Sequence, residues 1–277
     1  MADQADQLAG SARAEKFDTS RPNVARIYDY LLGGKEHFAA DRRAAEQLLA
    51  AMPNAATVAK ANRTFLAAAV QHVARAGVAQ FLDVGAGLPT SPSVHESARA
   101  IIPAARVAYV DNDPVAVTHA QALLATGDGV IAIEGDAHDP EAILASPRVA
   151  AVIDLAEPVC LLLVSMLHFF TADEADMIVG TFRQRLAPGS YLIISQGNSD
   201  TGPRDGIRQA YGSSVTLTGR PAAEIAAYFD GFDLVPPGLV PVAEWSAAQP
   251  DAWLPARLEQ PTSPQAGMVA GVGRKRA

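Results

Sequence analysis

From Gly77 onward the sequence alternates short apolar runs with segments of helical pattern, and this alternation restricts the fold more than any other feature. The runs are apolar at consecutive positions, which is typical of strands that are buried on both faces of a parallel sheet. Strands of this kind separated by helices predict an α/β, doubly wound sheet that is covered on each side. The expected strands are residues 79–84, 106–110, 130–134, 159–164, 190–195, 232–235 and 268–273.

Three helices are expected before this alternation begins. The first starts near Ser20, a plausible N-cap, has Pro22 in its first turn, and stops at the glycine pair that begins with Gly33. The second covers residues 40–52, and the third covers residues 54–76.

The sequence shows no internal repeat and no low-complexity linker, so one domain is the simplest partition. Residues 1–16 are polar and rich in alanine, and they are expected to form a disordered tail. Residues 17–277 are predicted to form a single domain, in which residues 17–76 are an N-terminal helical cap.

Composition excludes several classes of function. The formal net charge of -8 disfavours a nucleic-acid partner, because binding to a phosphate backbone depends on clustered Lys and Arg. The single cysteine, Cys160, excludes an internal disulfide and a cysteine-rich zinc site, so no metal is expected. No signal peptide is recognisable, and no apolar stretch approaches the roughly 20 residues needed to span a bilayer. A cytoplasmic protein without a membrane partner is therefore expected.

A glycine turn follows the first expected strand, in the segment from Asp83 through Gly85, Ala86 and Gly87. In a doubly wound sheet this turn lies at the carboxyl edge, where ligands bind. The dinucleotide fingerprint requires a third glycine three residues after the second, but Thr90 stands there. In addition, the Asp83 carboxylate would repel a pyrophosphate, whereas it suits a cofactor that carries an ammonium and a sulfonium. These two details disfavour a nicotinamide cofactor.

Acidic residues also end the next two expected strands. Asp111, followed by Asn112, ends the second strand, where a carboxylate can accept hydrogen bonds from both hydroxyls of a ribose. Asp136 and Ala137 follow the third strand, where the carboxylate can accept from an adenine amino group and the Ala137 N–H can donate to a ring nitrogen. Acidic residues at three consecutive strand ends predict a site for a nucleoside-bearing cofactor.

Together these motifs resemble those of the class I S-adenosylmethionine-dependent methyltransferases. A closer resemblance, to the actinobacterial S-adenosyl methyltransferase family that was formerly a domain of unknown function, is carried by three segments. They are RPNVARIYDYLLGGKEHF at residues 21–38, DVGAGLPT at 83–90, and PVCLLL followed by LHF within 158–169. The resemblance implies S-adenosyl-L-methionine as cofactor and a Rossmann-like sheet of seven strands, mostly parallel, with an antiparallel last strand. It does not identify the methyl acceptor.

The first helix carries a polar face formed by Asn23, Arg26 and Tyr30, whose spacing places them opposite its apolar stripe. Such a face is ordinarily solvated. Because a glycine break follows it at once, we expect a lid over the cofactor, with Arg26 as the cation for the cofactor's carboxylate and Tyr30 beside it.

His168 follows the fourth expected strand, where the acceptors of methyltransferases commonly lie. An imidazole there could take a proton from a hydroxyl acceptor, although a histidine between Leu167 and Phe169 can equally be a core residue. His37 is a weaker candidate for the same role.

The sequence therefore predicts methyl transfer from S-adenosylmethionine to a small-molecule acceptor, at oxygen or nitrogen. Two alternatives stay open: a non-catalytic protein that senses S-adenosylmethionine or its product, and, less favoured, an NAD(P)-dependent oxidoreductase. The sequence leaves a homodimer open.

Overall fold

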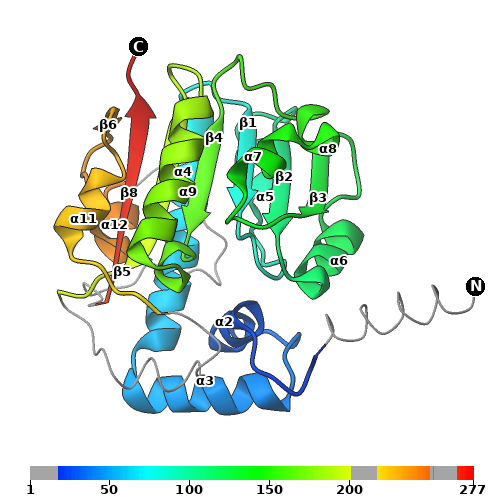
Figure 1. Ribbon diagram of the computed structural model, residues 1–277, viewed down its shortest axis with the longest axis vertical. Helices are drawn as coiled ribbons and strands as arrows, with labels where there is room; N and C mark the ends of the chain where they lie inside the picture. Colours follow the sequence, from blue (N-terminus) through cyan, green and yellow to red (C-terminus); the bar gives the residue numbers. More distant parts are fainter. Residues whose placement is uncertain (1–17, 201–216, 250–251, 253–266) are drawn as a thin grey trace, which may run out of the picture.

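The computed structural model describes residues 18–200, 217–249, 252 and 267–277 (Figure 1). One sheet forms its centre, with the strand order β3-β2-β1-β4-β5-β8-β6 and with β7 paired to β8. The strands are β1 (Gln80–Val84), β2 (Arg106–Asp111), β3 (Val130–Glu134), β4 (Cys160–Val164), β5 (Tyr191–Gly197), β6 (Phe232–Leu234), β7 (Val240–Pro241) and β8 (Met268–Lys275). Five strands, from β3 to β5 in this order, run parallel, and β8 is antiparallel to its neighbours.

The predicted doubly wound sheet with an antiparallel last strand is thus confirmed. The expected number of strands is one too low, because the segment after β6 forms a separate strand, β7, of only two residues. So short a strand has no alternation of side chains by which the sequence could reveal it.

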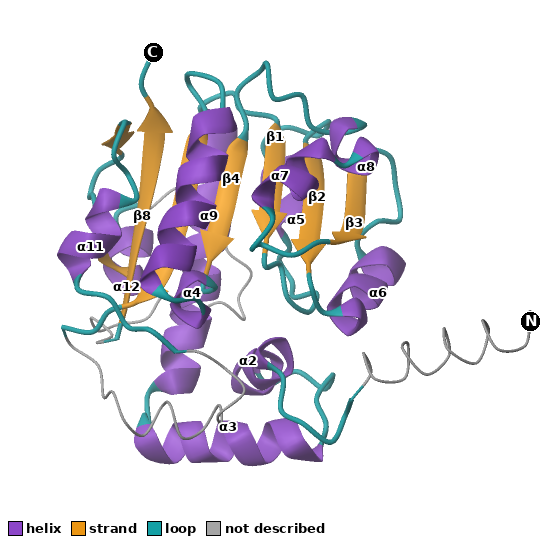
Figure 2. Ribbon diagram, viewed as in Figure 1, coloured by secondary structure: helices purple, strands orange, loops and turns teal. Residues whose placement is uncertain are grey.

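Helices cover both faces of the sheet, because its strands carry apolar side chains on each side (Figure 2). In β1, for example, Phe81 packs into the core on one face and Leu82 into the core on the other. The first face is covered by α4 (Ala55–Arg75), α5 (Val94–Arg99) and α12 (Val242–Ala247), and the second by α7 (Pro140–Ala145), α8 (Pro147–Ala150), α9 (Ala172–Arg185) and α11 (Ala222–Ala227). The helix after β2 is α6 (Pro114–Leu123).

Helix starts follow local capping chemistry. The capping boxes of Ser93 with Glu96 and of Thr171 with Glu174 are both formed at the starts of α5 and α9. The expected start of the first helix near Ser20 is wrong. Instead, Asn23 is the N-cap, because its side chain accepts hydrogen bonds from two backbone N–H groups of the first turn.

The first two described helices, α2 (Val24–Leu32) and α3 (Ala39–Ala51), form a cap with the start of α4. They share a small apolar cluster, which includes Ile27, Leu31 and Leu48. In Figure 1 both helices lie beneath the arrow tips of β1 to β4, at the carboxyl edge of the sheet. The cap therefore faces the edge at which the sequence predicts a site.

The division into a tail and one domain stays a prediction, and the tail lies outside the described residues. No helix within the described ranges has the length and apolar character needed to cross a bilayer.

Candidate active site

The chain leaves β1 through a glycine loop in which Gly85 and Gly87 have left-handed backbone angles. The φ angle is 73° at Gly85 and 66° at Gly87, a region that glycine enters without the steric cost of a side chain. The N–H groups of Gly85 and Ala86 donate to the Val110 carbonyl at 2.8 and 3.1 Å, which anchors the loop on β2. A Cβ at Gly85 would lie 3.1 Å from the Cβ of Met166, so the segment after β4 approaches this loop closely.

Asp111, at the end of β2, is joined to the same loop. Its Oδ2 accepts a hydrogen bond from the Gly87 N–H at 2.7 Å, and its Oδ1 accepts from the Asp113 N–H at 2.9 Å. Burial raises the pKa of this carboxyl, and the backbone donors oppose the rise. Since each carboxylate oxygen has a further lone pair, Asp111 retains acceptors for two ligand hydroxyls.

A pocket of about 430 Å³ lies where these strand ends meet. Its wall is formed by the glycine loop, the carboxyl ends of β2, β3 and β4, and parts of α2 and α4. This is the edge of a doubly wound sheet at which ligands bind. The predicted site residues that line it are Asp83, Gly85, Ala86, Gly87, Asp111, Asn112, Ala137 and His168. Their contact with a cofactor stays a prediction, but the fold brings them together as the strand-end argument requires.

Asp83 is the most unusual carboxyl of the pocket. It is only 7% exposed, and no group in the part of the chain that the structure describes donates a hydrogen bond to it. Burial raises its pKa to about 7, an effect that the positive charge of Arg63 reduces and the negative charge of Asp111 increases. A buried carboxyl with vacant acceptors is suited to a ligand ammonium.

Asp136 is not where the sequence argument put it. The residue is exposed and does not line the pocket, because its Oδ1 turns back to accept from the N–H of His138 at 3.0 Å and contacts the ring Nδ1 at 2.8 Å. Ala137 and His138 line the pocket in its place. The His138 ring also lies 3.6 Å from Glu174 and packs against Phe170 at 4.8 Å between centroids, so it links the ends of β3 and β4.

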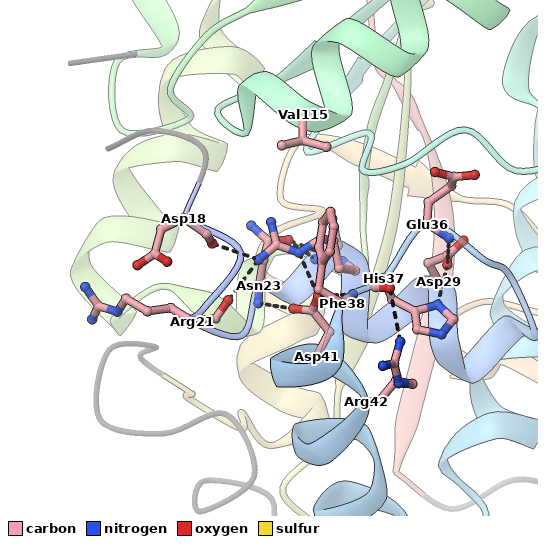
Figure 3. A network of polar contacts seen from close by, with 12 residues as sticks. Asp18, Arg21, Asn23, Asp29, Glu36, His37, Phe38, Asp41, Arg42 and Val115 are labelled. Atoms are coloured by element: carbon pink, nitrogen blue, oxygen red, sulfur yellow. Dashed lines mark hydrogen bonds and ion pairs between the residues drawn. The ribbon is translucent and has the colours of Figure 1, made fainter. Parts of the chain in front are cut away.

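Arg26 is likewise wrong as a pocket cation. It is 3% exposed, and its Nε donates to Asp41 Oδ2 at 2.9 Å. Its Nη2 donates to the carbonyls of Arg21 and Asp18 at 2.8 and 3.3 Å, and its guanidinium lies 5.4 Å from the centroid of the Phe38 ring. Figure 3 shows these partners gathered between the start of α2 and the start of α3. Arg26 therefore stabilises the contact between α2 and α3 within the cap.

Tyr30 also lies off the pocket, since it lies on the same side of α2 as Arg26. It packs edge-on against the ring of His37 at 5.1 Å. The Nδ1 of His37 in turn lies 3.1 Å from Asp29 Oδ2 (Figure 3), and His37 does not line the pocket either. The face of α2 that lines the pocket consists of Val24, Ala25, Tyr28 and Asp29.

Two residues of α4 that sequence reasoning missed line the pocket: Asn62 and Arg63. The Asn62 amide donates to the hydroxyl of Tyr28 at 3.0 Å, while its Oδ1 is buried and finds no partner within the described ranges. Arg63 donates through Nη2 to the Pro92 carbonyl at 2.7 Å. Helical periodicity identifies α4 but not the point at which it crosses the sheet edge, so the sequence carries no signal for this pair.

Ser165, just after β4, is a further missed residue. Its φ of 58° is a left-handed value that a non-glycine residue adopts at a cost. The strained backbone is held by β5, where both the carbonyl and the hydroxyl of Ser195 accept from the Ser165 N–H at 2.9 and 3.0 Å. Ser165 and the adjacent Met166 line the pocket, so the strain lies in its wall.

His168 lines the pocket and is 9% exposed. Burial, followed by the nearby charge of Arg220, lowers the pKa of its imidazole to about 4, so the ring is neutral at physiological pH. Its Nδ1 is buried and has no partner among the described residues. A neutral ring with a vacant nitrogen can form a hydrogen bond with a ligand. Its low pKa, however, makes it a weak general base, because it would not keep a proton taken from the acceptor near neutral pH.

Comparison with known proteins identifies the family. A family model described as S-adenosyl methyltransferase matches residues 10–276. A candidate methyltransferase from Thermobifida fusca YX is 38% identical, with a TM-score of 0.82 over 94% of this chain and 97% of that one. A DUF574 family protein from Streptomyces avermitilis is 36% identical, with a TM-score of 0.83 over 93% of this chain and 99% of that one. No curated protein matches the chain.

These matches extend over nearly the whole chain, and they include the glycine loop, the strand ends and the helical cap. They do not support the nicotinamide oxidoreductase that the glycine turn had left open. The chain belongs to the S-adenosyl methyltransferase family and is an S-adenosyl-L-methionine-dependent methyltransferase of the class I fold.

Proposed function

We propose that this methyltransferase acts on a small-molecule acceptor and methylates an oxygen or a nitrogen. The observation that carries the proposal is that His168, Phe169 and Phe170 line the same pocket as the glycine loop. A concave site of about 430 Å³ with aromatic walls and a few polar groups is typical of small-molecule recognition. The acidic chain, at a net charge of -8, is poorly suited to a polyanionic acceptor.

We assign the cofactor to the residues around the glycine loop. The vacant, buried carboxyl of Asp83 would bind its ammonium, and Asp111 would accept from its ribose hydroxyls. The glycine loop with Asn112 and the backbone of Ala137 would complete the contacts to its nucleoside. The partnerless Oδ1 of Asn62 is a further acceptor that fits an ammonium-bearing ligand.

The bound cofactor would supply a methyl group that is already activated by its positive sulfur. The protein then has to hold the acceptor in line, since alignment accounts for much of the rate of such a displacement. We assign the orientation of the acceptor to the vacant Nδ1 of His168, and the exclusion of water to Phe169 and Phe170.

Calorimetric titration with S-adenosylmethionine, S-adenosylhomocysteine and NAD tests the cofactor assignment. We expect micromolar binding of both adenosyl compounds, no binding of NAD, and loss of binding in Asp111→Ala. Retained binding in a folded Asp111→Ala protein would contradict the role of Asp111.

A panel of hydroxyl and amine acceptors, with product detected by mass, tests the proposed acceptor class. Cofactor binding without product across such a panel would favour the sensing role instead. If His168 orients the acceptor, His168→Ala should reduce kcat, and unchanged turnover would remove that assignment. A cytoplasmic location and a homodimer stay predictions from the sequence.

A further inference from the structure

Arg63 is the one Lys or Arg side chain that lines the pocket, within the part of the chain that the structure describes. It extends from α4, and its Nη2 is fixed by the Pro92 carbonyl at 2.7 Å. Its Nε is buried and has no hydrogen-bond partner among the residues that the structure describes. A buried guanidinium N–H without an acceptor is costly, so a ligand acceptor at this point would be favourable.

Arg63 also lines the same pocket as Asp83, the carboxyl that we assign to the cofactor's ammonium. Its charge acts on Asp83 strongly enough to oppose the effect of burial on the Asp83 pKa. No ion pair within 4.0 Å joins these two side chains among the described residues, so neither neutralises the other by direct contact. The same pocket thus offers the carboxyl of Asp83 and the guanidinium of Arg63, both with capacity for a ligand.

This arrangement matches the amino-acid end of the cofactor, where an ammonium and a carboxylate are attached to one carbon. Among the described residues, no other Lys or Arg lines the pocket to compete for the carboxyl. Arg26 is bound to Asp41 outside the pocket, and His168 is neutral because of burial.

We propose that Arg63 binds the α-carboxylate of the cofactor, and so selects adenosyl sulfonium compounds that retain this carboxylate over decarboxylated ones. The proposal rests on the assignment of the cofactor to this pocket. It gives Arg63 a binding role, because the guanidinium contacts the ligand directly and takes no part in methyl transfer.

The test compares two probes that differ only in the carboxylate: S-adenosylhomocysteine and its decarboxylated form, S-adenosyl-3-thiopropylamine. Calorimetry on the wild-type protein should give tighter binding of S-adenosylhomocysteine by about 10- to 150-fold, the range for a hydrogen bond to a charged group. Arg63→Gln keeps a polar side chain but removes the charge, and in it the two probes should bind almost equally. Arg63→Lys should restore part of the ratio.

Lys60→Ala is the matched control, because Lys60 is an exposed cation of the same helix that does not line the pocket. It should keep the wild-type ratio. A wild-type ratio near one would overturn the proposal without any variant, and so would an unchanged ratio in a folded Arg63→Gln protein. If neither probe binds the wild-type protein, the assignment of the cofactor to this pocket fails instead, which is a distinguishable result.

Discussion

At Asp83, folding and ligand binding favour opposite protonation states. Burial raises its pKa to about 7, so below that pH the neutral acid is the favoured form in the folded protein without ligand. Because the folded-state pKa is raised, this group contributes stability at low pH, and the contribution is lost as the pH rises through about 7. An ammonium ligand requires the carboxylate, so binding should release a proton when the pH is below that value.

We therefore expect the affinity for S-adenosylhomocysteine to fall by up to about tenfold per pH unit below the Asp83 pKa. Calorimetry at about pH 6 in two buffers of different ionisation enthalpy should detect the released proton. Methylthioadenosine, which lacks the ammonium, serves as the control and should release none. Equal proton release with both ligands would show that another group titrates.

The cost of burying the Asp83 carboxylate should also be visible in the free energy of unfolding. Asp83→Asn removes a buried charge, so its unfolding free energy should exceed that of the wild type at about pH 8, and the difference should shrink at about pH 5. Thermal unfolding at both values measures this, and Thr90→Ser is a control at a partly buried pocket residue that does not titrate. If the variant is less stable than the wild type at the higher pH, burial does not destabilise the Asp83 carboxylate.

At the scale of helices, α2 and α3 are joined by a buried ion pair. Asp41 is fully buried, and its carboxylate accepts from the Asn23 N–H, the Arg26 Nε and the Phe38 N–H at 2.9, 2.9 and 2.7 Å. The pair thus fixes the start of α2, whose next residues line the pocket.

Arg26→Ala would leave the Asp41 charge buried without its cation, and we expect a loss of about 3–5 kcal/mol in unfolding free energy. Urea unfolding measures it. Arg42→Ala is the control, since this neighbouring arginine is exposed and should change stability by less than about 0.5 kcal/mol. If Arg26→Ala lowers the unfolding free energy as little as the control does, the ion pair of Arg26 and Asp41 does not stabilise the cap.

At the scale of the whole molecule, the pocket joins the sheet edge to the helical cap. Ala25 of α2 packs with Leu88, Val115 and Ala116, and it would lie 3.8 Å from a Cβ placed on Gly87. A ligand in this pocket therefore contacts elements that are far apart in the sequence.

Binding of S-adenosylhomocysteine should slow amide hydrogen exchange in α2, in the glycine loop and in the segment after β4 together. Mass spectrometry of the exchanged peptides tests this, and the pairing of β6 with β8 at the far edge of the sheet serves as the internal control. Protection confined to the glycine loop would show that α2 does not cover the ligand.

The sequence by itself determined the fold class and the part of the pocket that the strand ends form. Both depend on local signals: apolar runs that reveal strands, and a glycine turn followed by acidic strand ends. Parallel strands bring their carboxyl ends to one edge whatever the details of packing, which is why Asp83, Asp111 and His168 meet there.

Only the tertiary structure decided which side chains of α2 and α4 line the pocket. The rotation of α2 about its axis depends on its packing against α3 and α4, so a polar face read from spacing did not reveal that Arg26 turns to Asp41. The presence of Arg63 and Asp83 in one pocket similarly depends on where α4 crosses the sheet. Contacts between elements far apart in sequence are set by packing of the whole molecule, and the local pattern of side chains does not encode them.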